Sequence, residues 1–60
     1  SKLLPALDDP SPYVRAFMVA ALGEFQDARA IVPLREMLQD EDETVRGMAA
    51  WALGNIENSQ

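Results

Sequence analysis

Two stretches of the chain, Asp9–Gly23 (DPSPYVRAFMVAALG) and Asp40–Gly54 (DEDETVRGMAAWALG), share one pattern and decide the fold. Each begins with Asp, continues to a Val-Arg pair and ends in Ala-Leu-Gly at the same spacing. When residues 1–29 are aligned with residues 32–60, eight of the 29 columns are identical, and they include every residue of this pattern. Because chance rarely preserves both order and spacing, we interpret the chain as a tandem repeat.

The second repeat predicts two helices joined by an acidic turn. The first of them has one apolar stripe at helical spacing and spans about 28–39. The stripe consists of Ile31, Leu34 and Leu38. Asp27 is placed to cap the start of this helix. Pro33 falls inside it, so we expect a late start or a kink there.

The next helix is predicted over about 43–55. Asp42 is its expected N-cap, and Gly54 lies where a left-handed residue would end it. Its buried face is expected to contain the apolar residues at spacings of three and four: Val45, Met48, Ala49, Ala52, Leu53 and Ile56. Gly47 inside this helix costs up to about 1 kcal/mol relative to Ala, so we interpret it as allowing another helix or a partner to approach closely.

The first repeat follows the same scheme. Ser11 followed by Pro12 is a strong helix start, and Gly23 is expected to end that helix. The predicted buried stripe consists of Val14, Phe17, Met18, Ala21, Leu22 and Phe25. A short helix over about 2–7 precedes it, and no strand pattern occurs anywhere in the sequence.

These elements predict an all-α fold of four helices in two helical hairpins, repeat one at about 1–26 and repeat two at about 27–60. The chain has 60 residues, no Cys and no His, so it has no disulfide, thiolate metal site or imidazole base. Helix pairs of this size bury their apolar faces by stacking on neighbours. We therefore expect part of a longer array, with neighbouring repeats or self-association covering exposed end faces.

The repeated pattern resembles the HEAT-like repeat, and more narrowly the short subtype named after phycobilisome bilin lyases. The resemblance covers about the whole chain and implies a right-handed α-solenoid. It also implies that the Asp and Arg of successive repeats form a ladder along the array. The ladder residues are Asp9, Arg15, Asp40 and Arg46. We interpret them as structural rather than as a binding site, because a bidentate Arg can tie a turn to its neighbour.

Three groups of relatives suggest finer functions. The bilin lyases attach or remove tetrapyrroles, and epoxyqueuosine reductases carry similar repeats that end in a segment like Val45–Gly54. An accessory subunit or domain of such a lyase, or a C-terminal module of such a reductase, is therefore the alternative function. Deoxyhypusine hydroxylases bind iron through His-Glu pairs, and this sequence has no His.

Composition and spacing argue against chemistry within this chain. The acidic run 40–43 lacks the Gly and the bidentate Glu that a calcium loop needs, so we interpret it as caps and a solvated turn. No hydroxyl side chain has a general base at a spacing that would indicate an activated nucleophile. We therefore predict no enzymatic activity, no metal and no cofactor. A net charge of −5 argues against nucleic-acid binding, because that binding depends on Lys and Arg side chains that neutralise phosphates. No apolar run is long enough for a membrane span, and we expect a cytoplasmic location.

We predict instead a protein-interaction or scaffold module that binds a protein partner along the second helix of each repeat. A helical wheel places small residues and two large aromatic residues on one flank of these helices. Tyr and Trp are favoured anchors at interfaces. The partner-binding residues predicted from this flank are Tyr13, Ala20, Gly47 and Trp51. Alternatively, Trp51 packs against a neighbouring repeat, or the repeats only stabilise one another.

Overall fold

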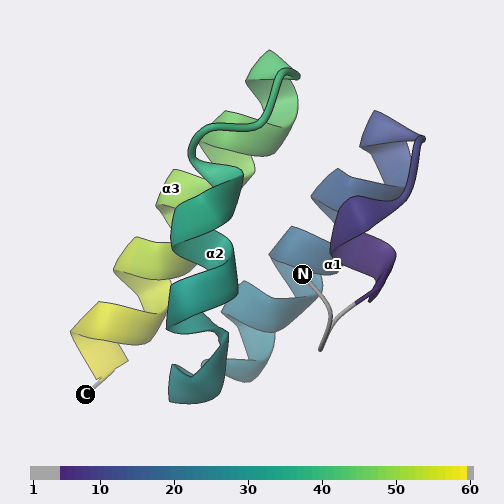
Figure 1. Ribbon diagram of the computed structural model, residues 1–60. Coiled ribbons are helices and arrows are strands. Elements are labelled where there is room, and N and C mark those ends of the chain that lie inside the picture. The colour runs from purple at the N-terminus through teal and green to yellow at the C-terminus, as the bar shows by residue number, and fades with distance from the viewer. Residues whose placement is uncertain (1–4, 60) are drawn as a thin grey trace.

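A computed structural model of the chain describes residues 5–59 (Figure 1), and within that range every regular element is helical. The elements are the 3-10 helix η1 (Pro5–Asp8), helix α1 (Pro12–Phe25), the 3-10 helix η2 (Ala28–Ala30), helix α2 (Ile31–Met37) and helix α3 (Glu43–Ser59). The predicted all-α class is confirmed. The helix expected over about 2–7 falls partly outside the described residues, and its described part is the short η1.

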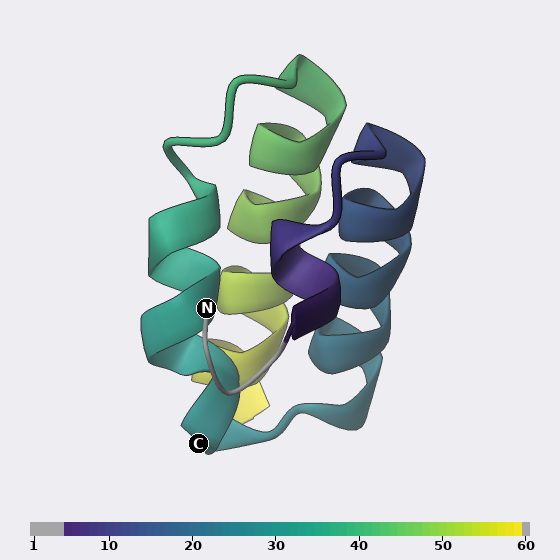
Figure 2. The ribbon, with the colours of Figure 1, turned by 45° about the vertical axis from the view of Figure 1, so that its right-hand side comes forward.

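The helices form two layers. Helices α1 and α3 pack side by side in one layer, with α2 lying on α3 and η1 on α1 in the other (Figures 1 and 2). The two halves of the chain therefore repeat one arrangement, a short helix that covers a longer one. Within residues 5–59, no helix is long and apolar enough to cross a membrane.

Helix α3 begins as the sequence predicts but runs further. The Asp42 carboxylate accepts a hydrogen bond from the Val45 backbone N–H at 3.0 Å, which satisfies one free donor of the first turn. The helix continues through Gly54 to Ser59, so the prediction that Gly54 ends it is wrong. The buried face has the predicted periodicity, and its fully covered members are Val45, Ala49, Ala52, Leu53 and Ile56.

Helix α1 starts after Ser11 with Pro12 in its first turn, as predicted, although the Ser11 side chain makes no capping hydrogen bond. The prediction that Gly23 ends this helix is wrong, because α1 continues to Phe25. Gln26 instead takes the left-handed conformation, with φ of 54°, and its N–H donates to the carbonyls of Leu22 and Gly23. The C-cap is thus formed by a residue type that the usual glycine signal does not identify.

The segment after the first repeat confirms the late start expected from Pro33. Asp27 accepts a hydrogen bond from the Arg29 backbone N–H, and one 3-10 turn follows before α2 begins at Ile31. Pro33 is then the third residue of α2, where a missing N–H breaks no intrahelical bond. The helix is shorter than predicted because its last turn tightens into hydrogen bonds of the 3-10 type that end at Asp40.

The core lies between the two layers and is centred on α3. Its largest fully buried side chains are Leu7, Val19, Leu34, Val45 and Ile56, none more than 1% exposed. The buried stripe predicted for α1 is wrong in part. Val14, Phe17 and Phe25 are 40%, 75% and 80% exposed, and α1 buries Arg15, Val19 and Gly23 instead. Met18 and Leu22 of the predicted stripe are half-buried against the core, whereas its exposed members lie on a side of α1 that no element of the described structure covers.

Gly47 is exposed on α3, and a Cβ built on it meets no atom within 4 Å, so the described structure contains no close approach at this position. We expect Gly47→Ala to stabilise the fold by up to about 1 kcal/mol, since Ala loses less backbone entropy in a helix. Urea unfolding followed by circular dichroism measures this change. Ala50→Gly, also exposed on α3, is the control and should lower stability by a similar amount. A loss of stability in Gly47→Ala would contradict the prediction.

Candidate functional site

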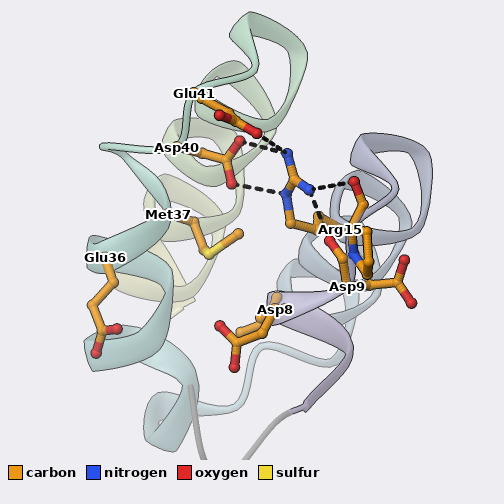
Figure 3. Close-up of a pocket in the computed structure, with 9 residues that line it drawn as sticks. Asp8, Asp9, Arg15, Glu36, Met37, Asp40 and Glu41 are labelled. Atoms are coloured by element: carbon orange, nitrogen blue, oxygen red, sulfur yellow. Dashed lines mark hydrogen bonds and ion pairs between the residues drawn. The ribbon is translucent and has the colours of Figure 1, made fainter.

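A buried guanidinium links the turns of the two repeats (Figure 3). Arg15 is 7% exposed, and its Nε and Nη2 donate to the two carboxylate oxygens of Asp40 at 2.9 and 3.0 Å. Its Nη1 donates to the backbone carbonyls of Asp9 at 2.7 Å and Pro10 at 3.1 Å. One side chain of α1 therefore holds its own repeat's turn and the next repeat's turn together, in a bidentate geometry.

The two turns are built alike. Asp9 Oδ1 accepts from the Ser11 backbone N–H, and Asp40 Oδ1 accepts from the Asp42 backbone N–H, both at 2.8 Å. Arg46 Nη1 donates to the Asp40 carbonyl at 2.7 Å, just as Arg15 does to the Asp9 carbonyl. The residues named as ladder members from the sequence thus occupy equivalent places, and Arg15 with Asp40 forms one rung between repeats.

The rung fixes the charges of both partners. Burial by itself raises the pKa of Asp40, but the hydrogen bonds from Arg15 and the Asp42 N–H, with the charges of Arg15 and Arg46, outweigh it and lower that pKa below its usual value. The hydrogen bond to Asp40 in turn raises the pKa of Arg15. Both groups are therefore ionised at neutral pH, and neither is poised to exchange a proton.

An open hollow of about 630 Å³ lies beside the rung, between η1 and the end of α2. Its polar lining consists of Asp8, Asp9, Arg15, Glu36, Asp40 and Glu41 (Figure 3). Asp40 is engaged by Arg15, and in residues 5–59 no three acidic side chains are grouped so that they could hold a metal ion. The acidic run 40–43 is used locally, since Asp42 caps α3 and Glu43 lies in its first turn.

The four residues predicted to meet a partner all lie on the α1–α3 layer. Tyr13 is 85% and Trp51 45% exposed, Gly47 is exposed and Ala20 is half-buried. Tyr13 also lines a hollow of about 140 Å³ between the starts of α1 and α3, together with side chains of both helices. The layer therefore presents aromatic side chains on both helices, Tyr13 on α1 and Trp51 on α3, and Phe17 and Phe25 are exposed on α1 as well.

Trp51 also has a packing role. A Cβ built on Gly23 would lie 2.8 Å from Trp51 Cζ3 and from Ala52 Cβ, and 2.9 Å from Ala52 Cα. Gly23 is therefore the position where α1 and α3 approach most closely among the described glycines, and the Trp51 ring covers it. Sequence reasoning assigned close approach to Gly47 and a helix end to Gly23. A glycine near the end of a helical pattern can mark either a helix end or a close approach between helices. At Gly23 it marks the close approach, and only the contact with Trp51 and Ala52 shows this.

Asn55 is a contact residue that the sequence analysis missed. Its Nδ2 donates to the Gly23 carbonyl at 2.7 Å, across the two repeats. Because Gly23 lies in the last turn of α1, its carbonyl is among those that lack a full set of helical partners. The one hint in the sequence is that Asn55 occupies the position at which the first repeat has the charged Glu24.

We expect Asn55→Ala to lower the free energy of unfolding by about 0.5–1.5 kcal/mol, since one interhelical hydrogen bond is lost. Asn58→Ala, at an exposed position on the same helix, should change stability little. Chemical unfolding of the two variants and the parent chain checks this. Equal effects of the two substitutions would mean that the Asn55 hydrogen bond contributes nothing.

Comparison with known proteins agrees with this architecture. The family described as HEAT repeats matches residues 1–60. No curated protein matches the chain.

Proposed function

Because the chain belongs to the HEAT-repeat family, whose members are generally protein-interaction scaffolds, we propose that it is a protein-binding module without catalysis of its own. The proposed binding face is the outer surface of the α1–α3 layer, with Tyr13, Ala20, Gly47 and Trp51 as its residues. The observation that supports it is the exposure of Tyr13 and Trp51 on adjacent helices of one layer. Aromatic side chains of this kind anchor interfaces because they bury large areas at low entropic cost.

The electrostatics of the chain are consistent with a binding rather than a catalytic role. The side chains with the best-defined polar contacts, Arg15 and Asp40, satisfy one another. Their pKa shifts favour the charged forms of both, whereas acid–base catalysis needs a group that titrates near the working pH. The Arg15–Asp40 rung is thus better suited to holding the layer rigid than to reacting. A rigid layer lowers the entropic cost of binding.

Two substitutions separate the binding role of this face from its packing role. Tyr13→Ala should leave the unfolding midpoint nearly unchanged, since the ring is 85% exposed, and should weaken capture of the partner at least about tenfold. Trp51→Ala should weaken capture and also lower stability, because the ring covers Gly23. Quantitative affinity capture from the source cells, followed by a direct titration with the captured partner, measures both effects.

Val32→Ala is the matched control, since Val32 is a 65% exposed apolar residue on α2, in the other layer. It should leave partner binding unchanged. If the titrations show unchanged affinity for Tyr13→Ala and Trp51→Ala while Trp51→Ala loses stability, these residues serve only packing and the proposed face is wrong.

The alternative proposal is an accessory module of a tetrapyrrole lyase or of a tRNA-modifying reductase. It rests on the resemblance of the repeats. The half-exposed Trp51 offers a direct test, because a bilin bound on this face would quench its fluorescence. Tight, saturable quenching by a free bilin would favour the lyase module, and the scaffold proposal expects none.

A further inference from the structure

The face formed by α1 and α3 carries an aromatic ring and a carboxylate at each of its two ends. At one end, Tyr13 and Asp42 line the same hollow of about 140 Å³, between the starts of the two helices. At the other end, the Trp51 ring reaches the last turn of α1, since its Cζ3 lies 2.8 Å from a Cβ built on Gly23. Glu24 is the next residue of that turn and lies about 20° around the helix from Tyr13, so it belongs to the same face.

Neither carboxylate is paired with a cation of residues 5–59. Glu24 is exposed and makes no ion pair in that range, and Asp42 makes none there either. The Asp42 Oδ2 atom accepts the capping hydrogen bond from the Val45 N–H, while its Oδ1 atom accepts none from the same residues. One carboxylate at each end of the face is therefore available to a cation from outside the chain.

In the part of the chain that the structure describes, this face also has no basic side chain. Arg15, the basic residue of α1, lies about 160° around that helix from Tyr13. Arg46, the basic residue of α3, lies about 140° around its helix from Trp51. Both arginines donate to Asp40 in the turn between α2 and α3. Exposed aromatic rings and unpaired negative charge complement a basic partner, because guanidinium groups stack on Tyr and Trp rings.

The separation of the two ends sets the spacing of the basic residues. Tyr13 and Gly23 are ten residues apart in α1, which is roughly 15 Å along the helix. An extended segment covers this distance in about four to five residues, and only an even separation puts two of its side chains on one face. Between the ends lie the small residues Ala16, Ala20 and Gly47, which leave room for the backbone of such a segment.

We propose that the α1–α3 face binds an extended basic segment of a partner protein, with two arginines four residues apart. One guanidinium stacks on Tyr13 beside Asp42, and the other stacks on Trp51 beside Glu24. The hollow at Tyr13 is smaller than the roughly 300 Å³ of the smallest ligand pockets, so it suits one side chain rather than a whole ligand. The segment occupies the face of the proposed function, so its binding rests on that proposal and adds the chemistry of the partner.

A synthetic peptide, Ser-Arg-Ser-Ala-Ser-Arg-Ser, tests this chemistry directly. Terminal acetyl and amide groups remove its end charges. The chain has a single Trp, so the fluorescence of Trp51 reports binding at this face. We expect saturable binding that weakens with added salt, and at least about threefold weaker binding of a peptide of the same composition with adjacent arginines. A peptide with glutamates in place of the arginines should not bind.

Neutral variants of the two carboxylates test their roles while keeping their size. Asp42→Asn retains an N-cap, because Asn caps helices as well as Asp does. Asp42→Asn and Glu24→Gln should each weaken peptide binding about two- to fivefold, as the loss of an exposed ion pair predicts, and the double variant should weaken it more. Glu57→Gln is the matched control with the same change of charge, since Glu57 lies on α3 but faces Arg35 of α2. It should leave the affinity unchanged.

The absence of saturable peptide binding to the parent chain overturns the proposal, as does equal binding of the peptide with adjacent arginines. Equal losses in Glu57→Gln and Glu24→Gln also overturn it, because they show attraction to the net charge of −5 rather than to this face. The proposed function fails separately. If a captured partner depends on the two aromatic side chains but not on the two carboxylates, the protein-binding face stands and the basic segment is wrong.

Discussion

Gly23→Ala should destabilise the protein by about 1–3 kcal/mol, although alanine is the better helix former. The added methyl group would lie 2.8 Å from Ala52 Cβ and from Trp51 Cζ3. The Trp51 ring can move aside, but the 2.9 Å approach to Ala52 Cα involves the backbone of α3, which cannot yield without separating the helices. A core of this size supplies about 3–5 kcal/mol in total, so the loss is a large part of it.

The repeat itself provides the matched control. Gly54 is the counterpart of Gly23, also lies inside a helix and has nothing within 4 Å of a built Cβ. Gly54→Ala should therefore raise stability by up to about 1 kcal/mol. Thermal unfolding resolves the difference in sign, since each kcal/mol shifts the midpoint by about 4–8 °C in a domain of this size. Equal shifts in the same direction for the two variants would exclude close approach at Gly23 as the cause.

A partial rescue identifies the contact responsible. Ala52→Gly in the Gly23→Ala background removes one of the two side-chain overlaps but leaves the approach to Ala52 Cα. We therefore expect the double variant to be more stable than the sum of the two single effects predicts, and still less stable than the parent chain. Strictly additive effects would show that residues 23 and 52 are not in contact.

Comparison of α1 with α3, the longer helices of the two repeats, shows which features can be predicted from the sequence. The buried face of α3 follows from periodicity, because every neighbour that covers it lies within the described structure. On α1 the same pattern is covered only in part: Met18 and Leu22 pack against the core, whereas Phe17 and Phe25 lie where no described element covers them and are exposed. Periodicity identifies the apolar side of a helix, whereas burial depends on what packs against that side.

The candidate site divides in the same way. Arg15 and Asp40 were named from the resemblance to HEAT-like repeats, and the structure places Arg15 in the first turn of α1 and Asp40 in the turn before α3. Asn55 was missed because an Asn near a helix end fits many roles, and only its partner, the Gly23 carbonyl, identifies this one. Tyr13 lies about 120° around α1 from the buried Val19, so periodicity predicts its exposure only once the buried side is known.

Asp40→Asn should lower the free energy of unfolding at neutral pH by about 1–3 kcal/mol. The substitution removes the charge that the buried Arg15 guanidinium faces and places an amide group, half of it a donor, against donors. Urea unfolding at pH 7 measures the loss. A double-mutant cycle with Arg15→Met separates the pair from other effects, because the two substitutions should be strongly non-additive if the rung is responsible.

The same carboxylate should make stability depend on pH in the acid range. The pKa of Asp40 is lower in the folded chain than in the unfolded chain, so its stabilising contribution is complete above the unfolded value of about 3.9 and is lost as the pH falls through the folded value. The parent chain should therefore lose stability below about pH 4, and Asp40→Asn should lose less over that range.

Asp27 is the comparison, because a hydrogen bond from Arg29 also lowers its pKa, but the Arg29 side chain is 90% exposed. Solvent screening makes that pair weak, so Asp27→Asn should leave most of the acid dependence in place. If Asp40→Asn retained the full acid dependence, the Arg15–Asp40 rung would not be what links the two repeats at neutral pH.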